Sequence, residues 1–99
     1  MKIDVNESDK IISLKVSGEI ETSSIKTFKE KLFEIGEKIN KDIEFDLSLV
    51  DYIDSSGVGI LISLLKLQKN KNKKFVITKI SPKVLDVIKL SSLSDTFNL

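Results

Sequence analysis

Residues 43–67 decide the fold of this chain, and they read IEFDLSLVDYIDSSGVGILISLLKL. Apolar and polar residues alternate from 43 to 48, which predicts a strand, and the apolar run 58–67 predicts a buried helix. Between them lies DSSGVG, residues 54–59. Aspartate and serine are preferred at a helix N-terminus, because their side-chain oxygens accept hydrogen bonds from unpaired backbone N–H groups. The hexapeptide is therefore either an ordinary helix cap or a site where a serine is modified.

The N-terminal residues predict a hairpin. Apolar residues alternate with polar ones over residues 2–6 and again over 12–17, and the polar segment 7–10 separates the two runs. This pattern is typical of two half-buried antiparallel strands joined by a turn. Gly18 is expected to end the second strand.

An amphipathic helix is predicted between residues 25 and 39, where apolar residues recur at spacings of three and four. The stripe consists of Ile25, Phe28, Leu32, Ile35 and Ile39. The segment Thr22-Ser23-Ser24 offers three candidate caps, and Asn40-Lys41-Asp42 closes the helix. The charged residues lie off the stripe and predict a solvated face.

The second half of the chain continues with alternating strands and helices. Residues 49–53 are expected to carry the chain over the sheet edge. The apolar run 75–77 predicts a central strand, and Ser81-Pro82 predicts the start of a third helix that ends near 91–92. Residues 96–99 are expected to form a last edge strand.

The predicted order is β-β-α-β-α-β-α-(β), in a single domain covering residues 1–99. Strands separated by helices imply an α/β fold, with a mixed sheet of four to five strands and helices packed on it. Loops that follow the carboxyl ends of parallel strands gather on one edge of such a sheet. We therefore expect the loops 18–24, 52–59 and 79–82 to meet there.

Composition argues against several classes of partner. The sixteen basic residues are all lysine, and they give a net charge of only +1. The sequence therefore predicts neither nucleic-acid nor membrane binding, since it has no basic field and no arginine for phosphate recognition. The first residues contain no signal-peptide core, and the longest apolar stretch is about half a membrane span. We expect a cytoplasmic protein that is a monomer or a weak dimer.

Enzymatic chemistry is not expected, because the chain contains neither histidine nor cysteine. Ser55 has no histidine to activate it as a nucleophile, and the two Ser-x-x-Lys matches at 23–26 and 63–66 are expected by chance among so many serines and lysines. A magnesium site formed by Glu19, Glu21 and Asp54 is a weaker interpretation than solvated loop acids. We predict no cofactor and no metal.

Five lysines gather in residues 66–74, at the end of the predicted second helix and in the turn after it. Lysine at this position complements the helix dipole and keeps the turn soluble. An acidic partner is the less favoured alternative.

The remaining chemistry is modification of Ser55 itself. A phosphate on Ser55 would lie at a helix N-terminus, where N–H groups and the helix dipole stabilise it by roughly 0.3–1 kcal/mol. A partner docked there would face about −1.5 to −2 units of new charge beside Asp54. The small residues Ser56 and Gly57 leave room for a kinase to approach.

The sequence resembles a STAS domain, specifically the bacterial anti-sigma factor antagonists of the sporulation and general stress regulons. Residues 54–59, preceded by Tyr52-Ile53, resemble the family signature Asp-Ser-Ser/Thr-Gly-Leu-Gly. Further similarity lies in Gly18-Glu19-Ile20 and Ile80-Ser81-Pro82, so the resemblance spans nearly the whole chain. It departs from the family at Glu21, where the family often has aspartate.

The resemblance implies that Ser55 is phosphorylated by an anti-sigma factor that is also a GHKL-type serine kinase. The unphosphorylated protein would bind that anti-sigma factor and free a sigma factor, and a serine phosphatase would reset the switch. The implied partner interface consists of Glu21, Thr22, Asp54, Ser56, Gly57, Val58 and Ser81. The alternative function is a constitutive STAS scaffold subunit of a stress-sensing or transporter complex, which needs no such serine.

Overall fold

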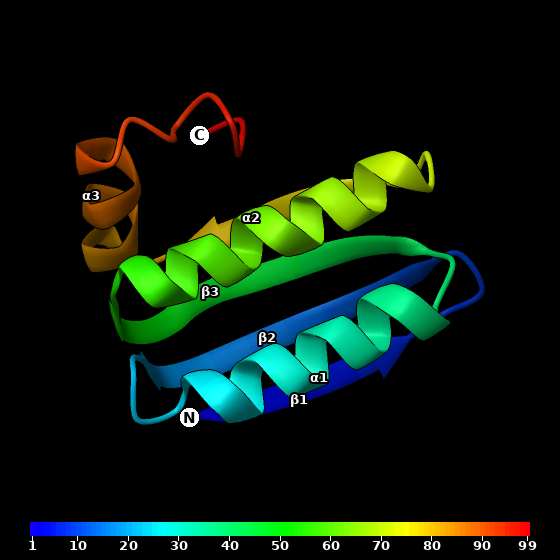
Figure 1. The fold of residues 1–99 in the computed structure, drawn as a ribbon, viewed down its shortest axis with the longest axis horizontal. Coiled ribbons are helices and arrows are strands. Elements are labelled where there is room, and N and C mark those ends of the chain that lie inside the picture. The colour runs from blue at the N-terminus through cyan, green and yellow to red at the C-terminus, as the bar shows by residue number, and fades with distance from the viewer.

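Four strands form one mixed sheet in the computed structural model, which describes residues 1–99 (Figure 1). The strands lie in chain order, β1 (Lys2–Glu7), β2 (Ile11–Ile20), β3 (Asp42–Ile53) and β4 (Phe75–Ile80). The pair β1–β2 is antiparallel, whereas β2–β3 and β3–β4 are parallel. The predicted α/β class, the element order and the mixed sheet are confirmed.

Three helices complete the fold: α1 (Ile25–Lys38), α2 (Ser55–Asn70) and α3 (Pro82–Leu90). Helices α1 and α2 lie side by side over one face of the sheet, and α3 stands near the N-terminal end of α2 (Figure 1). The predicted apolar stripe of α1 buries Phe28, Leu32 and Ile35. None of the three helices combines the length and the hydrophobicity that crossing a membrane requires.

A single apolar core lies between the sheet and the helices. Inward-facing residues of β2 and β3 form its floor, since alternate side chains of a strand share one face. These residues are Ile12, Leu14, Val16, Ile20, Ile43, Phe45, Leu47, Val50 and Ile53. The opposite face of the sheet carries mostly polar residues, of which Ser13, Lys15, Glu44 and Asp46 line a depression, and it also exposes Val76 beside Glu44.

Two strands run further than the sequence predicts. Gly18 does not end β2, because its φ of +93° and a shift in strand register let pairing continue to Ile20. Residues 49–53 stay within β3 and pair with residues 17–20 of β2, instead of leaving the sheet. Irregularities in the strand register keep Val50 and Ile53 pointing inward. The apolar residues of this part of β3 therefore do not alternate regularly with polar ones, so the sequence does not show a strand there.

The expected edge strand at 96–99 is also wrong. This segment forms turns, and Asn98 adopts a φ of +58°, which is incompatible with an extended strand. Phe97 is buried against Phe75, with ring centroids 6.0 Å apart, and Phe75 in turn packs on Phe45 at 5.3 Å. Packing of this aromatic ring therefore places the C-terminal segment over the core.

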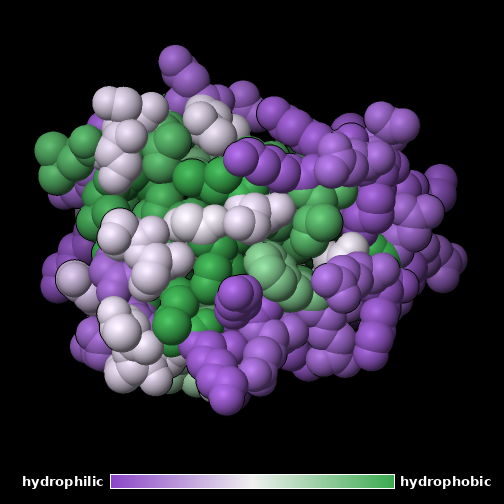
Figure 2. Space-filling view, in the orientation of Figure 1, coloured by the Kyte–Doolittle hydropathy of each residue, from purple (hydrophilic) through white to green (hydrophobic).

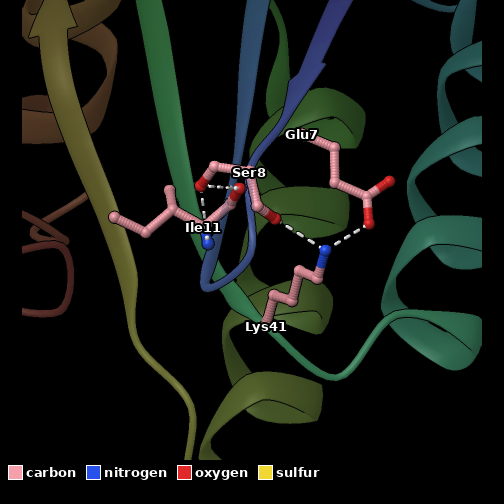
Figure 3. A network of polar contacts seen from close by, with 4 residues as sticks. All are labelled: Glu7, Ser8, Ile11 and Lys41. Carbon is pink, nitrogen blue, oxygen red and sulfur yellow. Dashed lines mark hydrogen bonds and ion pairs between the residues drawn. The ribbon is translucent and has the colours of Figure 1, made fainter.

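Hydrogen bonds from two lysines connect the loops and helix ends where α1 and α2 terminate. The Lys41 Nζ donates to Glu7 Oε2 at 2.5 Å and to the Ser8 carbonyl at 2.6 Å, which ties the β1–β2 turn to the start of β3 (Figure 3). The half-buried Lys71 donates to the carbonyls of Gly36 and Ile39, so it caps the C-terminus of α1.

The buried Gln68 donates from Nε2 to the carbonyls of Lys41 and Lys74, both at 2.9 Å. Replacing Gln68 with methionine keeps the volume and removes both hydrogen bonds. We expect Gln68→Met to lower the free energy of unfolding by about 0.5–1.5 kcal/mol, because two hydrogen bonds are lost while the Lys74 carbonyl keeps its bond from the Ile43 N–H. Urea unfolding measures this, with the exposed Asn70→Ala as the control. Equal midpoints for the two variants would contradict the role of Gln68.

Candidate functional site

Two of the three predicted loops meet at the carboxyl ends of β2 and β3. The last residues of the strands, Ile20 and Ile53, are paired, so both loops begin at the same level. The Asp54 N–H donates to the Ile20 carbonyl at 3.2 Å, and the Thr22 hydroxyl donates to Asp54 Oδ2 at 3.4 Å. The loop before α1 is thereby joined to the start of α2.

The third loop ends lower on the sheet. Because β4 stops opposite Leu47, Ser81 follows at the level of residues 47–50. Its N–H donates to the Leu47 carbonyl at 3.3 Å, and its hydroxyl donates to the Val50 carbonyl at 2.8 Å. Val50 precedes Ile53 by three residues, or roughly 10 Å of strand. Ser81 therefore anchors α3 to β3 and is not brought against Ser55.

Asp54 is the N-cap of α2 and the centre of the site. Its Oδ1 accepts hydrogen bonds from the Gly57 N–H at 3.1 Å and from the Ser56 hydroxyl at 2.5 Å, while Thr22 bonds to Oδ2. The bond from Ser56 lowers the pKa of Asp54 most, and the bonds from Gly57 and Thr22 lower it further, although burial opposes them by raising it in part. The carboxylate is thus held ionised and fully engaged.

Ser55 and Ser56 differ in what their hydroxyls do. The Ser56 hydroxyl is bound to Asp54, whereas the Ser55 hydroxyl forms no hydrogen bond within the protein and is exposed to solvent. Figure 2 shows pale, weakly polar residues gathered over the N-terminal half of α2, without the charged side chains that cover its other end. An incoming reactant would therefore meet a free hydroxyl on an uncluttered surface.

The two glycines of the hexapeptide have different surroundings. A Cβ on Gly57 would lie 2.7 Å from Ile20 and 2.8 Å from Ile53, so close packing on the strand ends requires glycine there. A Cβ on Gly59 would meet nothing within 4 Å. Val58, at 4% exposure, is part of the core. Gly57 and Val58 belong to the predicted interface, but they are buried beneath the exposed serines and offer a partner little accessible surface.

Acidic residues of the first loop do not form a metal site. The structure contains no group of three or more acidic side chains placed to hold an ion, so the alternative magnesium site of Glu19, Glu21 and Asp54 is not formed. Glu21 accepts a hydrogen bond from the Ser23 hydroxyl at 2.9 Å.

Ser24 is the N-cap residue of α1, but its hydroxyl does not cap the helix. The hydroxyl donates instead to the carbonyls of Glu19 and Glu21.

The sequence places Thr22 near the site but does not reveal its bond to Asp54. The available signal was weak, because any of the three hydroxyls at 22–24 fits a helix cap. Only the pairing of Ile20 with Ile53 brings Thr22, and not its neighbours, opposite the Asp54 carboxylate.

Comparison with known families gives a match to the STAS domain over residues 2–99. The chain belongs to the STAS domain family. A relative of this STAS domain is the anti-sigma-B factor antagonist of Staphylococcus aureus (strain NCTC 8325), which is 25% identical over 99 residues, covering 100% of this chain and 92% of the relative.

Solved structures share the fold of this STAS domain. The anti-sigma factor antagonist SpoIIAA in its unphosphorylated form superposes with a TM-score of 0.81 at 16% identity, covering 95% of this chain and 84% of that one. The Bacillus cell fate determinant SpoIIAA in the phosphorylated form gives a TM-score of 0.75 at 16% identity, covering 95% and 86%. At this identity the likeness establishes the fold alone.

The glycine environments give opposite expectations for alanine. We expect Gly57→Ala to destabilise the STAS domain by about 1–3 kcal/mol, because its methyl group overlaps two core side chains. Gly59→Ala should instead stabilise it by about 0.5–1 kcal/mol, since alanine is the better helix former and the space is open. Thermal or urea unfolding measures both changes in stability. A loss of stability in Gly59→Ala would contradict the open space found around Gly59.

The lowered pKa of Asp54 makes part of the stability depend on pH. Since folding lowers this pKa, the ionised carboxylate adds stability above its unfolded value of about 3.9, and the contribution is lost as the pH falls through the folded value. We expect Asp54→Asn to be less stable than the natural protein at about pH 7, and the difference in stability to shrink as the pH falls below about 3.9. Urea unfolding across this range tests the expectation. The control Asp51→Asn removes an exposed carboxylate that forms no hydrogen bond. If its stability difference from the natural protein depended on pH in the same way, the role assigned to the Asp54 carboxylate would be contradicted.

Proposed function

We propose that this protein is an anti-sigma factor antagonist switched by phosphorylation of Ser55. Unphosphorylated, it binds an anti-sigma factor that is also a GHKL-type serine kinase, and it thereby releases a sigma factor in the cytoplasm. A serine phosphatase restores the binding form. The observation that carries this proposal is the contrast between the free, exposed hydroxyl of Ser55 and the bound hydroxyl of Ser56.

The geometry favours Ser55 as the acceptor of the phosphoryl group. In the transfer, the Ser55 Oγ attacks the terminal phosphorus of ATP, its proton leaves to a base of the kinase, and ADP departs. Such a reaction depends on positioning, so the acceptor oxygen must be accessible from outside the protein. Ser56 would first have to break its bond to Asp54, whereas Ser55 has no bond to break.

The charge of the product explains the switch. Phosphorylation adds about −1.5 to −2 units of charge at neutral pH, next to a carboxylate that its hydrogen bonds keep ionised. The helix N-terminus tolerates this charge in the free protein. A partner that covers the site must desolvate it, and an unpaired buried charge costs several kcal/mol. Binding should therefore fail while the fold persists.

The proposed interface uses the exposed part of the predicted set. Thr22 and Ser56 are exposed around Ser55, and Glu21 and Asp54 lie partly exposed beside them. Gly59 adds to this surface, because no contact within the fold requires glycine there, although glycine weakens a helix. Glycine at position 59 is explained if a partner packs closely against the helix backbone there, because a side chain would keep the partner away. Ser81 does not lie beside Ser55; it affects the proposed interface only by fixing where α3 starts on the sheet.

The relatives support the same proposal. The Staphylococcus aureus relative is named an anti-sigma-B factor antagonist, and the structures of SpoIIAA represent an unphosphorylated and a phosphorylated form of one such protein. The same fold therefore accommodates both states of the switch in a similar protein.

Incubation with the cognate kinase and ATP, followed by mapping of the phosphate, tests the proposal. We expect Ser56→Ala to be phosphorylated and Ser55→Ala to remain unmodified, because only Ser55 has a free hydroxyl. Ser55→Asp should weaken partner binding by at least about 100-fold, whereas Ser55→Ala should bind normally. Calorimetry of the purified proteins measures both affinities.

The outcomes separate the proposed switch from the constitutive scaffold. Phosphate on Ser56 would contradict the assignment to Ser55 while keeping the antagonist function. Full partner binding by Ser55→Asp would remove the electrostatic explanation. A protein that no kinase modifies, and that is isolated within a stress-sensing or transporter complex, would be a scaffold.

A further inference from the structure

A strong positive charge gathers at the end of the molecule opposite Ser55. Five lysines and no acidic residue occupy residues 66–74, so the remaining chain has eleven lysines against fifteen acidic residues. The three ion pairs of the protein involve other lysines, namely Lys2, Lys38 and Lys41. Figure 2 shows this end of α2 densely covered with hydrophilic residues. None of the five lysines therefore forms an ion pair within the fold, although the carboxylate of Asp42 accepts the backbone N–H of Lys74.

Three of these lysines surround a groove, which we call the lysine groove. Lys69, Lys73 and Lys74 line it, together with the apolar residues Leu65, Phe75 and Val76. The turn 95–98 forms its other wall. Its volume of about 460 Å³ is within the range of about 300–1,000 Å³ that is typical of ligand sites. A ligand there would meet an apolar floor and a positive rim.

The groove opens beside an unpaired sheet edge. Strand β4 pairs with β3 on one side, and no strand lies on its other side. The C-terminal segment does not fill this position, since no backbone hydrogen bond outside the helices and strands involves residues 75–79. Val76 is 44% exposed on this strand. An extended peptide can add to such an edge through main-chain hydrogen bonds.

The lysines also repel one another. Burial lowers the pKa of Lys71, and the positive charge of Lys73 lowers it further. Asp95 lines the groove but forms no ion pair with the lysines. Lys71 itself does not line the groove, because its ammonium group donates to the carbonyls at the end of α1. An anion bound in the groove would offset the positive charge of Lys73, which does line it.

We propose that the lysine groove binds an extended acidic segment of a partner protein, which pairs with the free edge of β4 and places its carboxylates on Lys69, Lys73 and Lys74. Carboxylates suit these ligands, because lysine is a mobile point charge that needs no bidentate geometry. Nucleic acid is disfavoured, since the chain has no arginine and the only aromatic ring of the groove, Phe75, is 9% exposed and unavailable for stacking.

This site is separate from the phosphorylation site. The sixteen residues of α2 extend for about 24 Å between them, well beyond the distance of about 8 Å over which salt screens exposed charges. One partner can therefore occupy the Ser55 end while an acidic segment occupies the lysine groove. The groove proposal does not depend on phosphorylation of Ser55.

A fluorescent peptide of alternating glutamate and valine tests the groove in the full-length protein. We expect saturable binding that weakens as salt is added, and a loss of at least about tenfold in the double variant Lys69→Glu/Lys73→Glu. The matched control, Lys26→Glu/Lys31→Glu on the exposed side of α1, changes the net charge equally and should bind normally. Amide hydrogen exchange should slow at Phe75 and Ile77 when the peptide is bound.

The alternatives have distinct results. Equal losses in both double variants would show nonspecific charge attraction and overturn the proposal. Tighter binding to single-stranded DNA or to vesicles containing phosphatidylserine than to the peptide would assign the groove to another class of ligand. Ser55→Asp should bind the peptide like the natural protein, so failure of the groove proposal and failure of the phosphorylation switch are distinguishable.

Discussion

The carboxylate of Asp54 joins three parts of the molecule at one point. It caps α2 through the Gly57 N–H, fixes the Ser56 hydroxyl and accepts the hydroxyl of Thr22 from the loop before α1. This arrangement depends on the pairing of Ile20 with Ile53, which ends the two central strands at the same level. Because Asp54 accepts the Ser56 hydroxyl, the hydroxyl of the pair that stays free belongs to Ser55.

Much of this could be predicted from the sequence, because periodicity and helix caps are local properties. The stripe of α1, the cap at Asp54 and the strand–helix order all follow from spacing alone. The extension of β2 through Gly18 and of β3 through residues 49–53 could not be predicted, since register irregularities break the alternation. The position of residues 96–99 depends on one long-range contact, between Phe97 and Phe75.

The candidate site shows the same division. Ser55 and Asp54 were identified from the hexapeptide, but the level of Ser81 depends on how far β4 extends along β3, which no local pattern specifies. The buried position of Val58 likewise follows from the packing of α2 on the strand ends. Local sequence thus identifies the candidate residue, whereas the sheet decides which neighbours surround it.

The placement of Gly57 and Gly59 affects how the first turns of α2 move. Glycine gives up more backbone freedom than any other residue when it enters a helix, and two of the five residues 55–59 are glycine. Beneath them, the paired ends of β2 and β3 belong to the most buried part of the core. Local opening of α2 should therefore begin at the exposed Ser55 and Ser56, while the buried Gly57 and Val58 stay packed on the strand ends. The side chain of Ser55 can then change its orientation while the rest of α2 stays folded, and the hydrogen bonds of Asp54 restore the first turn.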